Sequence, residues 1–128
     1  MRRIFLPIVG ITLLATTALS QDPVKVDPKH YKVESENAEV RVVRVHYGPH
    51  EKSPMHAHPD AVAIFLTDGH TRFGLPGGKT QESTFKAGDA LFTPASKHAP
   101  ENLSDQPFDL ILVELKGKAA ASKSAASK

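Results

Sequence analysis

The sequence of 128 residues contains no cysteine. Disulfide bonds, thiolate metal sites and cysteine nucleophiles are therefore excluded. Any metal site has to rest on histidine and carboxylate side chains, and the chain holds seven histidines. A domain without disulfides must be held by its core alone, which is feasible at this length. The serines beyond residue 20 also lack a spacing to histidine that would indicate a nucleophile and its base.

The chain has little net charge. It has 16 lysines and arginines against 14 aspartates and glutamates, and without Arg2 and Arg3 the two counts are equal. Residues 21–115 carry 10 basic and 14 acidic side chains, a net charge of −4. They contain no basic stripe of the kind that binds nucleic acid, so the sequence predicts no nucleic-acid partner.

No apolar run reaches the roughly 20 residues that a membrane-spanning helix needs. The longest, Ile4 to Leu19, has 16 residues, follows a basic Arg2-Arg3 pair and ends in small residues up to Ser20. This pattern is typical of a secretory signal peptide cleaved after Ser20, with an uncleaved anchor as the weaker alternative. We expect residues 1–20 to be the signal peptide, and the mature protein to be periplasmic or secreted, without a membrane partner after cleavage.

The rest of the chain divides into three parts. Residues 21–30 contain two prolines and are predicted to form an N-terminal arm. Residues 31–116 are predicted to form one β-barrel domain. Residues 117–128 consist of one glycine followed by alanine, serine and lysine without apolar periodicity, and are predicted to be a disordered tail.

No segment after residue 21 has a convincing helical period. Short apolar or β-branched segments instead alternate with turn signals, which predicts an all-β sandwich or barrel of eight to ten strands. Asp68-Gly69 is predicted to form a hairpin turn, and residues 76–79 a second turn. The predicted strands, besides a short one at the first histidine pair, cover residues 31–34, 40–47, 61–67, 70–75, 80–86, 90–93, 98–103 and 107–115. The phenylalanines predicted to lie in the core are Phe65, Phe73, Phe85, Phe92 and Phe108.

Two histidines stand one residue apart just before the apolar segment at residue 61. In an extended strand, His56 and His58 point to the same face. Two imidazoles on one face form half of a site for zinc or another first-row metal, which takes three or four ligands. His98 follows a second apolar strand that can lie beside the first in an antiparallel barrel. The sequence therefore predicts a metal site of His56, His58 and His98.

These motifs resemble those of the cupin superfamily. The first cupin motif is matched by His56-Ala57-His58 through Gly69, and the second by Gly88, Pro94, Ser96, His98 and Asn102. The resemblance implies a cupin-like double-stranded β-helix, also called a jelly-roll barrel, and maps the three histidines onto metal-ligand positions. It also implies that barrels pair through strands, with Val40–Val45 as the expected seam of a homodimer. Asn102 is expected to hold a turn or the backbone rather than to touch a substrate.

The chain departs from the family pattern at one ligand. The glutamate of the first motif would fall at residue 62 or 63, where this chain has Val62 and Ala63. The expected site is therefore a neutral face of three histidines, with open positions for water or substrate. Asp60, His50 and Glu51 are nearby candidates for a fourth ligand.

Three functional alternatives follow. In the first, an exported cupin binds a divalent transition metal (Fe, Mn, Zn, Cu or Ni) and acts on a small oxygen-bearing substrate, and the resemblance suggests dioxygenation or isomerisation. In the second, the protein is a module that binds or senses a metal or small ligand without turnover. In the third, it is a metal-free structural barrel. The three-histidine set favours metal binding and leaves catalysis open.

Overall fold

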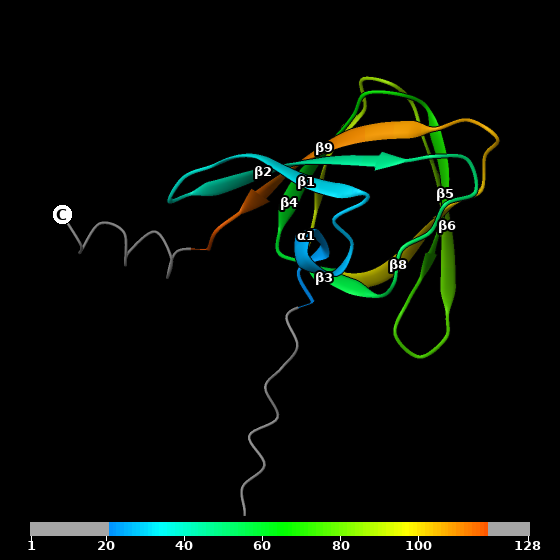
Figure 1. Cartoon of the computed structure of the whole chain (residues 1–128), viewed down its shortest axis with the longest axis horizontal. Coiled ribbons are helices and arrows are strands. Elements are labelled where there is room, and N and C mark those ends of the chain that lie inside the picture. The colour runs from blue at the N-terminus through cyan, green and yellow to red at the C-terminus, as the bar shows by residue number, and fades with distance from the viewer. Residues whose placement is uncertain (1–20, 118–128) are drawn as a thin grey trace, which may run out of the picture.

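The computed structural model describes residues 21–117, in which nine strands and one short helix form two antiparallel sheets (Figure 1). The predicted all-β architecture is confirmed, and nine strands lie within the expected range. The predicted tail from residue 118 and the predicted signal peptide lie outside the described residues. In chain order the elements are α1 (Pro23–Val26), β1 (Tyr31–Glu36), β2 (Val40–Tyr47), β3 (His56–His58), β4 (Ala61–Phe65), β5 (Gly69–Gly74), β6 (Thr80–Phe85), β7 (Ala90–Thr93), β8 (Ser96–Asn102) and β9 (Phe108–Leu115).

The two sheets curve around a shared interior, as in a double-stranded β-helix. The larger sheet has the strand order β1-β2-β9-β4-β7, and the smaller one has the order β3-β8-β5-β6. Strands adjacent in sequence mostly belong to different sheets from β3 onward, so the chain crosses repeatedly between the two layers. The β1–β2 hairpin extends beyond the barrel, as Figure 1 shows.

The two predicted turns differ in outcome. Residues 76–79 do connect a hairpin, because β5 and β6 pair and the turn contains Gly77 and Gly78 with positive φ values of 85° and 81°. Asp68-Gly69 is not a hairpin turn. It carries the chain from β4 in the larger sheet to β5 in the smaller one, and the Asp68 carboxylate accepts a hydrogen bond from the backbone N–H of Ala87. A dipeptide signal reports a local reversal but cannot say which strands pair.

The predicted arm, residues 21–30, contains the helix α1. Asp22 caps the one-turn helix α1 by accepting a hydrogen bond from Val24 N, and Pro23 begins the helix. One turn is too short to produce an apolar period in the sequence. The segment packs on the barrel, because Pro23 is buried and Ala57 N of β3 donates a hydrogen bond to Gln21 O.

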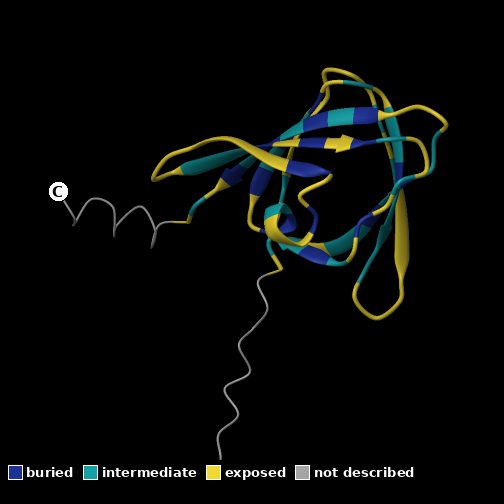
Figure 2. Cartoon of the chain, in the orientation of Figure 1, coloured by how far each residue is buried: buried dark blue, intermediate teal, exposed yellow. Residues whose placement is uncertain are grey.

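The core lies between the sheets and follows the alternation of the strands (Figure 2). In β9, every second side chain from Phe108 to Leu112 is buried, and β4 contributes Ala63 and Phe65. The buried core residues are Tyr31, Val43, Val45, Tyr47, Ala63, Phe65, Phe108, Leu110 and Leu112, with Phe85 partly buried against them. The prediction for Phe92 is wrong: it is 58% exposed on β7, an edge strand with both faces largely accessible.

The strand β2 lies inside the larger sheet. Both of its edges are hydrogen-bonded, one to β1 and one to β9. The prediction that Val40–Val45 forms a dimer seam is therefore wrong for pairing through strand edges. A homodimer through another surface stays a prediction.

Candidate metal centre

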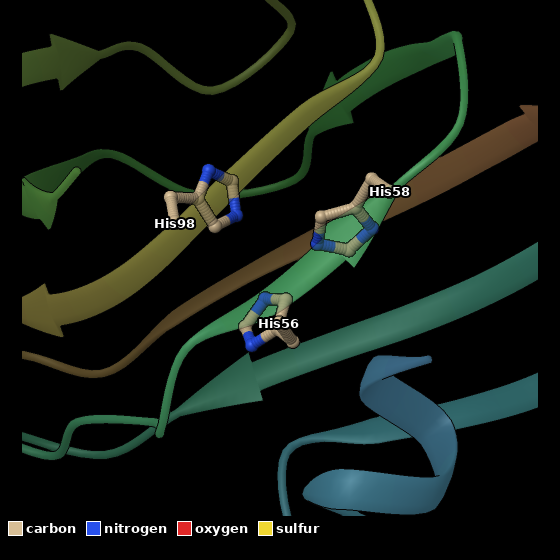
Figure 3. Close-up of side chains that lie close together, drawn as sticks. All are labelled: His56, His58 and His98. Carbon is tan, nitrogen blue, oxygen red and sulfur yellow. The ribbon is translucent and has the colours of Figure 1, made fainter. Parts of the chain in front are cut away.

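Three histidines from two neighbouring strands converge in the smaller sheet (Figure 3). His56 and His58 lie on β3, and His98 lies on β8 directly opposite His56 in the antiparallel register. Their ligand nitrogens all lie within 4.8 Å of one another. The predicted pairing of these strands and the predicted convergence of the three imidazoles are confirmed.

The ring orientations leave the same nitrogen available on both histidines of β3. Nδ1 of His56 lies 2.9 Å from the carbonyl oxygen of Pro54, which can only accept, so this nitrogen carries the proton. Nδ1 of His58 lies 3.2 Å from Oε1 of Glu114 and donates to that carboxylate. This arrangement leaves Nε2 of both rings as the atom that can bind a metal ion, and on His56 that atom also lies 3.1 Å from the Tyr31 hydroxyl.

Glu114 is a buried carboxylate that the sequence reasoning missed. It is 2% exposed on β9 and also accepts a hydrogen bond from Nε of Arg41 at 2.7 Å, while Arg41 pairs with Asp22 at 2.8 Å. Burial acts to raise the pKa of Glu114, but the hydrogen bonds from His58 and Arg41 outweigh it and lower that pKa. A signal was present: Glu114 continues the buried face of β9 that begins at Phe108.

His56 and His98 are held in the neutral form that binds metals. Burial, followed by repulsion from His58, lowers the pKa of His56 to about 4. Burial, followed by the charges of His58 and His56, lowers the pKa of His98 to about 3. A metal ion at His56 and His98 would therefore compete with few protons near neutral pH.

A chain of three hydroxyl groups runs from the cluster toward the helix α1. The hydroxyl of Tyr31 lies 3.1 Å from Nε2 of His56 and 2.8 Å from the hydroxyl of Tyr47. The Tyr47 hydroxyl lies 2.5 Å from that of Ser53. Ser53 in turn donates to the carboxylate of Asp27. All five side chains in this chain are buried.

This network of hydrogen-bonded side chains continues from Asp27 to the surface through His30. Nδ1 of His30 lies 2.6 Å from Asp27, and Nε2 lies 2.9 Å from Glu51, which also pairs with the exposed Lys29. The His30 ring stacks on Tyr47 at 4.2 Å. The sequence analysis named Glu51 only as a candidate ligand and did not predict this network, because its residues come from the predicted arm and from segments far apart in sequence, and no local motif unites them.

A cavity of about 480 Å³ lies between the sheets beside the cluster. His58 and His98 are part of its wall, and most of the remaining wall is aliphatic or aromatic. Phe73 lies in the wall next to His98, with ring centroids 5.0 Å apart. Thr71 also belongs to the wall, and its hydroxyl is buried without a hydrogen-bond partner among the described residues. The cavity suits a mainly apolar ligand with few polar atoms.

A family model for the cupin domain matches residues 43–114. The chain belongs to the cupin family. The match covers more than half of the chain and includes all three histidines of the cluster.

Solved cupin structures share the fold. A cupin domain (bp2299) from Bordetella pertussis Tohama I is 26% identical, with a TM-score of 0.63 over 68% of this chain and 92% of that one. A double-stranded β-helix protein from Klebsiella pneumoniae is 25% identical, with a TM-score of 0.55 over 70% and 77%. The DMSP lyase DddQ from Ruegeria pomeroyi is 18% identical, with a TM-score of 0.50 over 72% and 49%, a likeness of fold alone. A comparison with curated proteins finds no match.

This cupin has small or branched apolar residues where the family has its glutamate. Ala63 is buried and lies in the cavity wall. The three candidates for a fourth ligand are not part of the cluster. Asp60 accepts a hydrogen bond from Ala95 N, and His50 pairs with Asp105. Glu51 is engaged by His30 and Lys29, as described above. Within residues 21–117, the cluster consists of imidazoles alone.

Asn102 has the structural role that was predicted for it. It is fully buried, and its amide donates to the carbonyl oxygens of Gly48 and Gln106. Its side-chain oxygen accepts from Ser104 N. It thereby joins two loops at the end of β8.

Among the described residues, no helix is long and apolar enough to cross a membrane.

Proposed function

We propose that this cupin binds a divalent transition metal ion through His56, His58 and His98 and presents it to a small ligand in the adjoining cavity. The observation that carries the proposal is the convergence of three imidazoles beside the cavity, where His58 and His98 form part of the wall. On both histidines of β3 the Nδ1 atom has a hydrogen-bond acceptor, which leaves Nε2 as the ligand atom. The carboxylate behind His58 supports it, because metal-binding histidines commonly donate their other ring N–H to such a group.

The ligand that fits this site is small and mostly apolar, with an oxygen atom directed at the metal. The cavity offers a mostly apolar wall with few polar residues, among them Thr71, whose hydroxyl has no hydrogen-bond partner within residues 21–117. A metal bound by three neutral imidazoles keeps its full charge and attracts oxygen anions. In the proposed activity, Fe, Mn, Zn, Cu or Ni at this site promotes dioxygenation or isomerisation of such a compound.

Metal analysis of the purified protein tests the site. Wild type is expected to retain about one metal ion per chain, and the variant with His56, His58 and His98 all replaced by alanine is expected to retain none. The matched control replaces the same number of histidines outside the cluster, and its residues are His46, His50 and His70. Equal metal content in wild type and the cluster variant contradicts the proposal. Thermal stabilisation of wild type by added metal, following mass action, removes the metal-free barrel as an alternative.

A non-catalytic binding or sensing module is the second candidate. The observation in its favour is that the cluster contains no carboxylate within the described residues. Oxygen consumption or product formation by the metal-loaded protein with a panel of phenolic and diketone compounds distinguishes the two. Ligand binding without turnover by any redox-active metal form supports the module.

We also propose that the protein is exported after cleavage behind Ser20, to the periplasm or the outside. The basic pair, the apolar run and the small residues at its end support this. N-terminal sequencing of the mature protein from cell fractions tests it. The expected first residue is Gln21, and an intact N-terminus in the cytoplasm contradicts export.

A further inference from the structure

The network of three hydroxyl groups beside the metal centre has fewer hydroxyl protons than hydrogen-bond contacts. Four contacts link His56 to Tyr31, Tyr31 to Tyr47, Tyr47 to Ser53, and Ser53 to Asp27. Each contact needs one proton, and three hydroxyl groups supply three. One of the four contacts therefore has no proton, and the groups at the two ends of the hydroxyl network determine which contact that is.

Both ends of this chain act as acceptors. At one end, Nδ1 of His56 uses its proton on the carbonyl of Pro54, so Nε2 of the neutral ring has only a lone pair. At the other end, Asp27 is ionised: burial acts to raise its pKa, but hydrogen bonds from Ser53 and His30 outweigh this and lower it. Without a metal ion, two acceptors therefore compete for the protons of three hydroxyls.

A metal ion on Nε2 of His56 removes this competition. The lone pair of Nε2 then coordinates the ion, so three contacts between the remaining groups share the three hydroxyl protons. Every hydroxyl can donate in the same direction, from Tyr31 to Tyr47, from Tyr47 to Ser53, and from Ser53 to the Asp27 carboxylate. Tyr31 then has no proton left for the metal side, and its oxygen lone pairs face that side.

We propose that Tyr31 is a hydrogen-bond acceptor for a water molecule or a ligand O–H group bound to the metal, and that Tyr47, Ser53 and Asp27 are positioning residues that fix this polarity. The proposal rests on the proposed metal centre. It predicts selectivity: the site favours metal ligands that carry a proton toward Tyr31 over ligands that present only lone pairs. Tyr31 is suited to this role because its oxygen lies 3.1 Å from the ligand atom of His56.

The experiment uses the full mature protein loaded with cobalt(II), whose visible spectrum reports exchange of its ligands. Cobalt content is measured first, and failure of wild type to hold one ion per chain overturns the metal centre and this proposal together. The loaded protein is then titrated with azide, an anion that displaces water and has no proton to donate. In wild type, azide loses the hydrogen bond that water gives to Tyr31.

The sign of the change in Tyr31→Phe decides the proposal. If Tyr31 is an acceptor, its removal tightens azide binding by about tenfold, the equivalent of one hydrogen bond. If Tyr31 is a donor, the same variant weakens azide binding, which overturns the proposal, as does no change. Cobalt affinity must stay within about threefold of wild type, because a loss on the scale of one hydrogen bond or more would make Tyr31 a metal ligand instead.

Ser53→Ala tests the polarity from a distance. Ser53 has no contact with the cluster, but its loss deprives the Tyr47 hydroxyl of its acceptor and lets Tyr47 donate to Tyr31. Tyr31 can then donate to azide, so azide binding is expected to tighten in this variant too. Unchanged azide affinity in a folded Ser53→Ala protein overturns the positioning role, and far-ultraviolet circular dichroism verifies the fold of both variants.

Discussion

His58 Nδ1 and Glu114 Oε1 lie 3.2 Å apart and join an imidazole of the smaller sheet to a carboxylate of the larger one. Arg41 holds the other carboxylate oxygen at 2.7 Å. A negative charge is thus placed behind the histidine cluster rather than within it. This arrangement orients the His58 ring so that Nε2 is left as its metal-binding atom.

Glu114→Gln is expected to weaken metal binding by about 10- to 100-fold, the usual effect of losing a group that orients a metal-binding histidine. The amide keeps the shape of the side chain but removes the charge that faces His58 and Arg41. Competition with a chromogenic chelator measures the affinity. Asp109→Asn is the matched control on the same strand, because Asp109 faces the exposed His46. Equal affinities of the two variants would show that Glu114 does not serve the site.

Arg41→Met is expected to destabilise the metal-free protein by about 3–5 kcal/mol, since it leaves the buried Glu114 without its charged partner. Urea denaturation measures the free energy of unfolding. Arg44→Met is the control, three residues further along the same strand and on its opposite face. Arg44 pairs with Glu34 at the surface, and its loss should change stability little. A small effect of both substitutions would contradict the importance of the buried pair.

Asn102→Ala is expected to destabilise the protein by about 2–4 kcal/mol, because it removes a fully buried amide with three hydrogen bonds. The carbonyls of Gly48 and Gln106 lose their donor. Thermal unfolding of the metal-free form measures this without involving the histidines. A variant as stable as wild type would show that the two loops hold without Asn102.

The sequence predicted the strands well because their signals are local. The β-branched run at Val40–Tyr47 and the alternating segment before Leu115 coincide with β2 and β9 almost residue for residue. Strand partners were harder, since pairing depends on contacts far apart in the chain. Asp68-Gly69 is the instructive case: a good turn signal connects two sheets instead of two paired strands.

The same difference between local and long-range signals separates the site residues that the sequence predicted from those that it did not. His56, His58 and His98 were found because their spacing sits in two recognisable motifs. The residues behind them had no such spacing, and Glu114 and Tyr31 reach the cluster from opposite ends of the domain. A buried carboxylate in an otherwise apolar face is a usable signal, whereas the contact of a tyrosine with a histidine 25 positions away is not.

The histidine cluster should make the metal-free protein lose stability in weak acid. The pKa of His56 is lowered to about 4 and that of His98 to about 3, mainly by burial, against an unfolded value near 6.5. As the pH falls from about 6.5 toward 4, the unfolded chain takes up protons that the folded protein refuses. Stability therefore falls over this interval, by up to about 1.4 kcal/mol per pH unit for each histidine.

Urea denaturation at a series of pH values between 7 and 4 measures this slope. His98→Asn removes one of the two groups and is expected to flatten the curve between pH 6.5 and about 5.5, above the range in which carboxyl groups of the unfolded chain begin to take up protons. His70→Asn, at a half-exposed position paired with Glu82, is the control and should keep the wild-type slope. A curve that is flat in wild type between pH 6.5 and 4.5 would mean that the folded cluster accepts protons readily, and a metal ion would then have to compete with them.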